Sequence, residues 1–395
     1  MSDLKTYLDK VRIRNFLSLR DVELPLKPLT VLVGPNASGK SNILAALGLL
    51  RDMVTSEELP SVKAIQSQIW AGGADSIHLE LEANIEGKAI CYTVEIRPDV
   101  DNRIFQEKLM VNQVKVISVK AGKGRVRDED DAHEVDYRSK ELALKSAGAY
   151  GEKPVTKYLT EFIRGWEFYD IDPREIRLGR VFTFSDLTDL VAELVDDLLS
   201  ASLNNDGANL HSILSRWHNH DKKRFQAVNQ AFKDCIKLGM GMHGDEETSL
   251  ELSFFEGYPI PIPLDMVSDG TLRLLAYQVL VNQSELPPLI TIEEPEKNFH
   301  PAWLNTLSDL LDQLSKRTQV IITTHSSQLL DTFASQSLAD NLSVLLLRNV
   351  PGRGTEVIPL DKIQSDRTGL KSWIDEFGIG SAIFDSELLQ DIMEV

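Results

Sequence analysis

The sequence predicts an α/β fold with a mixed or parallel core sheet, an antiparallel β subdomain and a separate helical lobe. Three observations support this prediction. The apolar run 29–33 leads directly into a glycine-containing turn, and helical spacing follows from 42 to 53. Residues 76–96 alternate between apolar and polar side chains, as half-buried antiparallel strands do, whereas residues 185–238 show the spacing of helices.

The composition is that of a folded globular protein. The chain has 395 residues, 42% of them hydrophobic and 26% charged, which suits one large domain or two lobes. The two cysteines, Cys91 and Cys235, are far apart and belong to no CxxC pair, so no disulfide framework or zinc site is expected. The N-terminus lacks the pattern of a signal peptide, and no apolar run approaches the roughly 18 residues that cross a bilayer. We therefore expect a cytoplasmic protein with no membrane span.

The net charge of −18 argues against a surface built throughout for nucleic acid, because binding phosphates requires clustered Lys and Arg. Two local basic strips remain candidates for DNA contact. One runs from Lys115 to Arg127, and the other contains Arg174, Arg177 and Arg180. Such charge runs are more often a solvated loop or face than a DNA contact.

Four segments are expected along the chain. They are an N-terminal part of the core at 1–75, a β-rich subdomain at 76–184 with a mobile polar excursion at about 121–151, a helical lobe at 185–280, and a C-terminal part of the core at 281–395. In the helical lobe, the heptad spacing does not persist for three or four repeats, so no long coiled coil is expected.

A phosphate-binding loop is predicted at residues 34–41. Its sequence, Gly-Pro-Asn-Ala-Ser-Gly-Lys-Ser, fits the pattern G-x-x-x-x-G-K-[ST] in full and lies where a strand meets a helix. Lys40 is expected to reach the β and γ phosphates of ATP, and the Ser41 hydroxyl is expected to bind Mg²⁺. The residues expected to contact the nucleotide are Gly34, Asn36, Ala37, Ser38, Gly39, Lys40, Ser41 and Asn42, with Asn36 and Asn42 beside the loop.

Two carboxylates follow the apolar strand 289–292. An ATPase places a metal-holding acid and a water-orienting base at such a strand end. Glu293 is expected to bind Mg²⁺ directly or through water, and Glu294, on the other side of the strand, is the candidate for polarising the attacking water. A second buried strand, 319–324, ends at His325, which is expected to contact the γ phosphate and to respond to its presence.

The segment 266–275 resembles the signature loop of RecF, SMC and OLD-like ATPases, in which a serine and a glycine at a helix start bind the γ phosphate held by the opposite head. Ser268 and Gly270 occupy those positions here. The stretches 14–16, 206–210, 294–301 and 323–326 also fit that group. The chain is thus similar to standalone OLD/RecF/SMC-like, ABC-type AAA ATPases (AAA_21-like). The resemblance implies an ABC-type P-loop NTPase head that hydrolyses ATP to ADP and phosphate with Mg²⁺, and that pairs by enclosing ATP between two heads.

Two departures from the resemblance matter. OLD-family nucleases carry a C-terminal Toprim domain, but only about seventy residues follow His325, so we expect no Toprim domain and no DNA cleavage by this chain. The glutamine that usually links the lobes to Mg²⁺ is not assigned by the sequence. Gln66 and Gln68 are both candidates, and an ordinary surface helix would explain either of them.

These features support one function over its alternatives. The first hypothesis is the ATPase half of a two-component bacterial system for anti-phage defence, in which a homodimer or higher oligomer of heads controls a separately encoded nuclease or toxin. The alternative is a DNA-repair ATPase similar to RecF, which clamps DNA. A transporter motor fits poorly, because the signature and the residues after the acid pair differ from that class.

Overall fold

The computed structural model describes residues 6–98, 104–131, 133–138, 140–147, 152–179, 202–243, 251–255, 260–367 and 369–386. The chain divides into two compact units. Unit 1 comprises Met1–Glu167, Pro287–Glu294 and Ser315–Val395, and unit 2 comprises Phe168–Leu286 and Pro295–Leu314. The short strand β10 (Glu167–Tyr169) lies where the chain passes from the first unit to the second.

Unit 1 contains a mixed sheet, as predicted. The strands of this sheet that lie wholly in unit 1 are β14 (Leu289–Glu293), β15 (Gln319–Thr324), β3 (Leu29–Val33), β16 (Leu342–Val350) and β17 (Gly354–Pro359), in that spatial order. The first four are parallel to one another, and β17 forms an antiparallel hairpin with β16. All residues of β3 and β15 are buried, which explains why, apart from Gln319, both strands contain only apolar residues and threonine.

Unit 1 also contains an eight-stranded antiparallel sheet in the order β2-β1-β4-β5-β6-β7-β8-β9. The strands are β1 (Thr6–Phe16), β2 (Leu19–Pro25), β4 (Ile77–Ile85), β5 (Lys88–Ile96), β6 (Ile104–Val111), β7 (Val114–Lys120), β8 (Lys123–Arg127) and β9 (Glu134–Arg138). Burial alternates residue by residue along β4, so the period-two pattern of the sequence marks its inner face.

The stretch 121–151, expected as a polar excursion, contains regular structure. Strands β8 and β9 pair with each other, and helix α3 (Ala143–Ala147) follows. Each of the two strands buries a single side chain, Val126 or Tyr137, while its other side chains are at least partly exposed. With one buried position in five residues, an edge hairpin leaves too little apolar alternation to be recognised from the sequence.

A buried glutamine joins the two sheets of unit 1. The Leu8 N–H donates to Gln319 Oε1 at 2.8 Å, and Gln319 Nε2 donates to the Leu8 carbonyl at 2.8 Å. The side chain therefore pairs with β1 as a neighbouring strand would, at the point where the register of β1 against β4 shifts. This contact fixes the start of β15, the strand that leads to His325.

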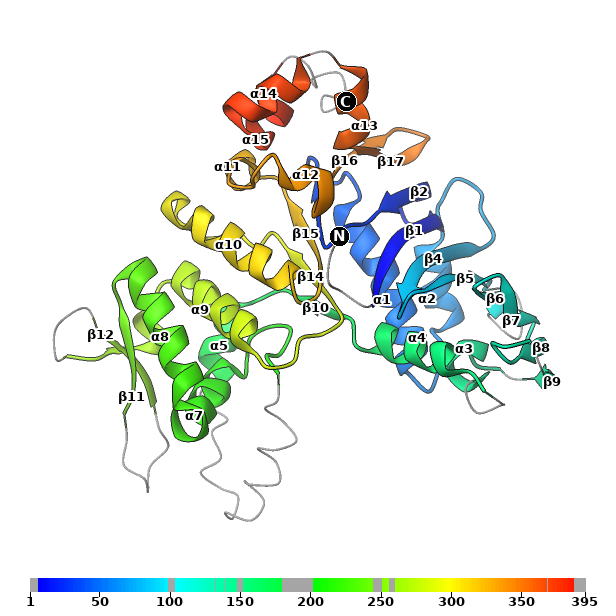
Figure 1. Ribbon diagram of the computed structural model, residues 1–395, viewed down its shortest axis with the longest axis horizontal. Coiled ribbons are helices and arrows are strands. Elements are labelled where there is room, and N and C mark those ends of the chain that lie inside the picture. The colour runs from blue at the N-terminus through cyan, green and yellow to red at the C-terminus, as the bar shows by residue number, and fades with distance from the viewer. Residues whose placement is uncertain are drawn as a thin grey trace. The chain divides into compact units, whose positions relative to one another are not determined.

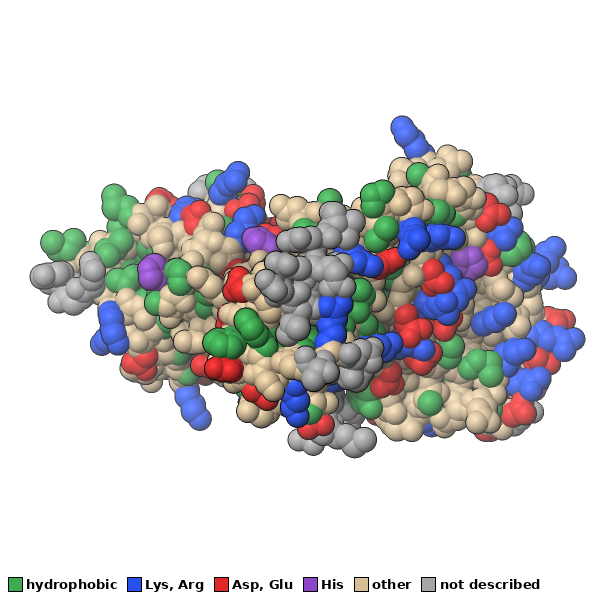
Figure 2. All heavy atoms as spheres, turned by 90° about the horizontal axis from the view of Figure 1, so that it is seen from above, with side chains coloured by type: hydrophobic (Ala, Val, Ile, Leu, Met, Phe, Trp, Pro, Cys, Tyr) green, Lys and Arg blue, Asp and Glu red, His purple; other side chains and the backbone are tan. Residues whose placement is uncertain are grey.

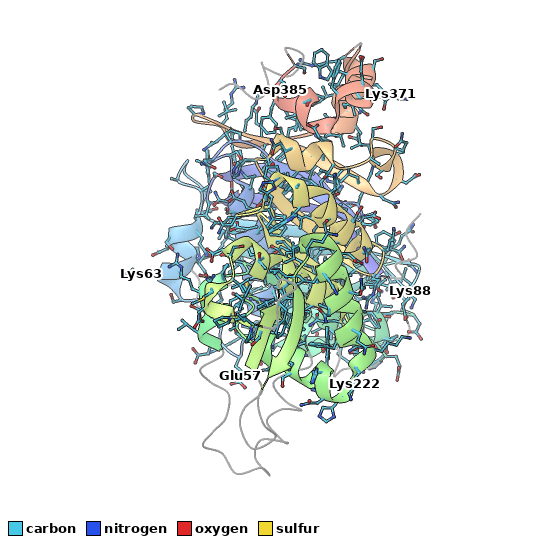
Figure 3. All side chains as sticks on the ribbon, turned by 90° about the vertical axis from the view of Figure 1, so that its left-hand side faces the viewer. Glu57, Lys63, Lys88, Lys222, Lys371 and Asp385 are labelled. Carbon is cyan, nitrogen blue, oxygen red and sulfur yellow. The ribbon has the colours of Figure 1, made fainter. Side chains whose placement is uncertain are left out.

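Helices cover the sheets of unit 1. They are α1 (Lys40–Thr55), α2 (Val62–Gln68), α4 (Pro154–Arg164), α11 (Ser327–Asp331), α12 (Ser337–Asp340), α13 (Leu360–Asp366), α14 (Leu370–Phe377) and α15 (Ile379–Phe384), together with α3. Helix α15 packs against α11 (Figure 1). Charged side chains such as Lys63 on α2 and Lys371 on α14 lie on the outer surface (Figure 3). Among the described residues, no helix combines the length and apolar composition that a bilayer crossing requires.

Unit 2 is mainly helical. It contains α5 (Pro173–Gly179), α7 (Leu210–His220), α8 (Lys222–Ile236), α9 (Asp269–Asn282) and α10 (Leu304–Ser315), with the short turns η2 (Leu264–Met266) and η3 (Pro301–Trp303). A small sheet of β11 (Gly239–His243), β12 (Glu251–Phe255) and β13 (Ile262–Pro263) accompanies them. Helix α9 is buried at every position from Gly270 to Val281 and forms the centre of the unit. Residues 185–201 of the segment 185–238, which is expected to be helical, lie outside the described residues.

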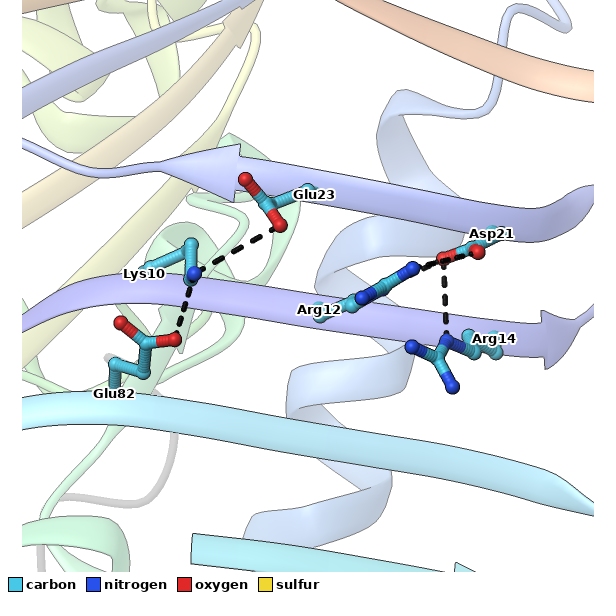
Figure 4. A network of polar contacts seen from close by, with 6 residues as sticks. All are labelled: Lys10, Arg12, Arg14, Asp21, Glu23 and Glu82. Carbon is cyan, nitrogen blue, oxygen red and sulfur yellow. Dashed lines mark hydrogen bonds and ion pairs between the residues drawn. The ribbon is translucent and has the colours of Figure 1, made fainter. Parts of the chain in front are cut away.

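Strands β1, β2 and β4 carry a network of ion pairs on one face of the antiparallel sheet (Figure 4). Asp21 accepts from Arg12 Nε at 2.9 Å and from Arg14 Nε at 3.3 Å, while Lys10 contacts Glu82 at 2.6 Å. The Arg12 hydrogen bond lowers the pKa of Asp21. Because these side chains are partly exposed, each pair contributes little to stability, and the network mainly fixes cross-strand register.

A fully buried glutamate on β6 holds the start of α3. Glu107 accepts hydrogen bonds from the Tyr92 hydroxyl at 3.0 Å and from the Leu144 and Ala143 N–H groups at 2.7 and 2.5 Å. Burial raises the pKa of Glu107 from its usual 4.5 to about 7, although these three hydrogen bonds lower it in part. Folding thus favours the protonated carboxyl group.

Glu107 is therefore expected to make stability depend on pH. Its favourable contribution is complete below about pH 4.5 and is lost as pH rises to about 7, a change on the order of 3 kcal/mol. Relative to Glu107→Gln, the parent should lose stability across this range when urea unfolding is measured at successive pH values. Glu86→Gln, at the exposed β4–β5 turn, is the control. Parallel parent and Glu107→Gln curves would contradict the assignment.

Candidate functional site

Three of the predicted motifs meet at one edge of the mixed sheet. Strands β14, β15 and β3 are parallel and in register, with Glu293 beside Thr323 and Thr324 beside Val33. The residues that follow these strands are Glu294, His325 and Gly34, respectively. The carboxyl ends of parallel strands form a common edge, so the phosphate loop, the acid pair and the histidine are brought together there.

The loop 34–39 has the backbone of an anion cradle. Ala37 and Gly39 have φ values of 63° and 104°, and the Ser38 N–H donates to the Pro35 carbonyl at 3.2 Å. Such a turn, followed at once by the N-terminus of α1, directs N–H groups and the positive end of the helix dipole toward one point. Glycine is required at 39, because a Cβ there would lie 2.3 Å from Thr355 Oγ1.

Lys40 lies over this loop. Its side chain is buried, and Nζ donates to the Gly34 carbonyl at 2.7 Å and to the Pro35 carbonyl at 3.0 Å. The ammonium group is thus held at the cradle, where phosphate oxygens can take the place of these two carbonyls. Ser41 follows in the first turn of α1 and is exposed.

The two asparagines beside the loop differ in their surroundings. Asn36 is exposed in the loop. Asn42 Nδ2 donates to Ser18 Oγ at 2.7 Å, so its amide is occupied by the turn between β1 and β2. Sequence reasoning missed Ser18, as it missed Thr355 on β17, because neither residue belongs to a recognisable motif.

Glu294 and His325 contact each other. Glu294 has a φ of 43°, and its N–H donates to the Thr323 carbonyl at 3.0 Å, so the chain turns sharply after β14. Glu294 Oε1 lies 3.0 Å from His325 Nδ1. A carboxylate only accepts hydrogen bonds, so the Nδ1 atom carries the proton and Nε2 is the ring nitrogen left for another partner. Both side chains are partly exposed, as a site for a ligand requires.

The structure distinguishes the two candidate glutamines. The Leu17 N–H donates to the Gln68 carbonyl at 2.7 Å, and the Trp70 N–H donates to the Asn15 carbonyl at 3.0 Å. The Gln68 Oε1 atom is buried and has no hydrogen-bond partner among the described residues, whereas Gln66 is exposed. Gln68 is therefore tied to the turn that also carries Ser18, and Gln66 has the features of a surface residue.

Unit 2 contains the predicted signature residues. Ser268 caps α9, because its Oγ accepts from the Thr271 N–H at 3.3 Å. A Cβ on Gly270 would lie 2.3 Å from the Asn298 carbonyl, so the loop after the acid pair packs directly on the helix start. On another side, Arg177 Nη2 donates to the Val267 carbonyl at 2.7 Å and lies 2.8 Å from Asp269 Oδ1. The signature segment is thus held within its own unit.

The residues present fit a magnesium–nucleotide site. Ser41 and Glu293 offer hydroxyl and carboxylate oxygens, which Mg²⁺ prefers, while phosphates and water supply most ligands of such an ion. Among the described residues, no group of three or more His, Cys, Asp or Glu side chains is placed to hold a metal ion. A nucleotide-bound Mg²⁺ does not need such a group.

Arginines of both basic strips make internal contacts. Arg125 lies 3.1 Å from Glu134, Arg127 lies 3.2 Å from the same carboxyl group, and Arg177 holds the signature segment. Arg180 lies outside the described residues. Figure 2 shows Lys and Arg side chains interleaved with Asp and Glu on the face that it presents. These contacts favour surface ion pairing over phosphate binding at the three arginines.

The family model AAA_21, described as "AAA domain, putative AbiEii toxin, Type IV TA system", matches residues 29–331. The crystal structure of an SMC head bound to the C-winged helix domain of ScpA resembles the chain with a TM-score of 0.50 and 16% identity. The resemblance covers 91% of this chain and 99% of that one, and at this identity it shows the fold alone. It confirms the predicted ABC-type P-loop head.

Curated relatives match the chain to different extents. The Retron Vc95 probable ATPase of Vibrio cholerae is 23% identical over 385 residues, covering 83% of this chain and 73% of that protein. An OLD nuclease of Thermus scotoductus is 41% identical over 59 residues, and a DNA replication and repair protein RecF of an Arthrobacter species is 35% identical over 88 residues. The chain spans only 10% of that nuclease and 22% of that RecF. These matches confirm the resemblance to OLD and RecF ATPases, and the SMC head shares the fold.

Proposed function

Because the chain belongs to the family described as "AAA domain, putative AbiEii toxin, Type IV TA system", an ABC-type ATPase group, we propose that it binds Mg²⁺–ATP at the loop 34–41 and hydrolyses it to ADP and phosphate. One observation carries this proposal. The phosphate loop, the acid pair and His325 converge at the carboxyl ends of β3, β14 and β15. That edge is where open α/β sheets bind ligands.

Each residue of this edge has a task in the proposed reaction. Lys40 and the loop N–H groups bind the β and γ phosphates, and Ser41 and Glu293 hold Mg²⁺, which neutralises phosphate charge. Glu294 orients a water molecule and accepts its proton as that water attacks the γ phosphorus and the bond to the β–γ bridging oxygen breaks. His325 holds the Glu294 carboxylate through Nδ1. Gln68, whose carbonyl accepts from the Leu17 N–H next to Ser18, is the candidate residue that responds to the metal.

Hydrolysis is proposed to require a second copy of the chain. Ser268 and Gly270 belong to unit 2, whereas the phosphate loop belongs to unit 1. Ser268 is exposed at the start of α9, and the neighbouring Met266 is 78% exposed. An accessible serine at a helix start suits contact with the γ phosphate held by another head. The exposed apolar side chain beside it suits contact with the protein surface of that head.

The paired heads are proposed to control a separately encoded effector, in a role related to anti-phage defence. The alignment with a retron's probable ATPase supports this role, since it extends over most of both chains. The test is to express the parent and the Lys40→Ala variant with the products of neighbouring genes. We expect an effector to co-purify, and its activity in cells to change with Lys40→Ala. Lack of both a complex and an effect of Lys40→Ala would reject effector control.

The match to RecF over 88 residues supports a second candidate, an ATP-dependent DNA clamp. This candidate predicts a DNA complex in a gel that requires ATP and weakens steeply with salt. The effector hypothesis predicts ATPase activity that does not respond to duplex DNA at low salt. Measuring ATP turnover with and without DNA therefore separates the two candidates.

A further inference from the structure

A chain of hydrogen bonds connects three distant segments at the phosphate loop. Asn42 Nδ2 donates to Ser18 Oγ at 2.7 Å, Ser18 Oγ lies 2.7 Å from Thr355 Oγ1, and Thr355 Oγ1 donates to the Ser38 carbonyl at 3.0 Å. Each hydroxyl has one proton. Because the Thr355 hydroxyl donates its proton to the Ser38 carbonyl, the Ser18 hydroxyl must donate to Thr355 Oγ1 and accept from the Asn42 amide. The direction of every bond in this donor chain is thereby fixed.

The donor chain closes a ring around Gly39. It begins at Asn42 and ends at Ser38, which flank Gly39 on either side. A Cβ at position 39 would lie 2.3 Å from Thr355 Oγ1 and 3.0 Å from Ser18 Oγ, so the two hydroxyls lie directly against this glycine. The Thr355 N–H also donates to the Ser18 carbonyl at 2.8 Å, which holds the two segments together through their backbones.

We propose that Ser18 and Thr355 are positioning residues of the ATP site, an inference that rests on the proposed binding of ATP at this loop. In a planar trans peptide the carbonyl and the N–H point in opposite directions. By holding the Ser38 carbonyl, Thr355 therefore turns the Gly39 N–H to the opposite side of the loop. An anion cradle depends on such N–H groups being oriented before the phosphate arrives.

The same turn reaches a second part of the site. Leu17, next to Ser18, donates its N–H to the Gln68 carbonyl at 2.7 Å. Leu17 and Asn15 both have positive φ values, 49° and 59°, so the backbone of this turn is held in a conformation that non-glycine residues rarely adopt. The turn thus fixes the Gln68 backbone and the phosphate loop relative to each other.

Thr355→Val tests the proposal, because valine keeps the branched shape and removes only the hydroxyl. We expect the Kd for ATP, measured by calorimetry, to rise about 10-fold, since a buried carbonyl loses its donor. The kcat at saturating ATP should stay within about twofold of the parent, because the oriented N–H contributes to ground-state binding. Thr355→Ser restores the hydroxyl and should bring the Kd back to within about threefold of the parent.

Thr160→Val is the matched control. The Thr160 side chain is also buried, and its hydroxyl donates to the Leu144 and Thr156 carbonyls rather than to the phosphate loop. This variant should leave the Kd for ATP unchanged. If Thr355→Val does not fold, Ser18→Ala replaces it, with the same expected rise in Kd. The double variant should bind no more weakly than either single one, because the donor chain acts as a unit.

The outcomes separate this inference from the proposed function. A parent protein that does not bind ATP contradicts the proposed function itself. A parent that binds ATP, with a Thr355→Val variant whose Kd is within twofold of it, overturns the positioning role alone. Equal loss in Thr355→Ser and Thr355→Val also overturns it, since restoring the hydroxyl would then not restore ATP binding.

Discussion

Replacing Glu294 with glutamine should lower the kcat for ATP hydrolysis on the order of 10²–10⁴-fold, the usual contribution of a general base. The amide keeps the size of the carboxylate and its contact with the His325 ring but cannot take a proton from water. Because Glu294 lies after β14 and outside the loop 34–41, the Kd for ATP should change little. ATP should then accumulate in paired heads, since the step that releases them is slowed by the same factor.

The measurement combines phosphate release, ATP affinity and size in solution. Lys40→Ala gives the opposite pattern, with ATP binding itself lost, because the ammonium group that lies over the cradle is removed. Glu57→Gln and Lys63→Ala change exposed residues of the same unit (Figure 3) and should behave like the parent. A Glu294→Gln protein that hydrolyses ATP at the parent rate would show that another group activates the water.

The sequence predicted the parts of the fold in which local pattern and tertiary environment agree. The continuous apolar run of β3 is buried on both faces, and the alternation of β4 is buried on one. The hairpin of β8 and β9 was missed because each strand buries one side chain. Local patterns report only burial, and an edge hairpin in a large sheet is specified mainly by backbone pairing.

The residues of the candidate site also divide into those that the sequence identified and those that only the structure revealed. The loop 34–41 and the pair Glu293–Glu294 were identifiable because each is contiguous and follows an apolar strand. Thr355 was not, because it meets Ser18 across 337 residues of sequence and has no motif of its own. The choice of Gln68 over Gln66 depended likewise on a backbone contact with Leu17, which no spacing encodes. Motifs reveal the groups proposed to contact the ligand, whereas the residues proposed to orient those groups are found only in three dimensions.

Replacing Gly270 with alanine should lower ATP hydrolysis about 100-fold while leaving the Kd for ATP of a single head close to that of the parent. The added Cβ would lie 2.3 Å from the Asn298 carbonyl, a distance that forces the helix start or the loop to move. A displacement near 1 Å at a positioning group costs about 100-fold in rate. Affinity should be spared because the phosphate loop belongs to unit 1 and Gly270 to unit 2.

Gly239→Ala is the control for this effect, because it adds the same methyl group to the same unit. The nearest atom to a Cβ at 239 is the Phe255 carbonyl oxygen at 3.9 Å, an ordinary contact. ATPase assays on mixtures of the Gly270→Ala and Lys40→Ala proteins sharpen the test. Gly270→Ala damages the signature segment, whereas Lys40→Ala damages the loop that holds the nucleotide. If heads act in trans, a mixed pair contains one site with both Lys40 and Gly270 intact, so mixing the two variants should recover activity. The mixture could also stay inactive although each variant still pairs with the parent. That result would show that the signature segment acts on the nucleotide of its own chain.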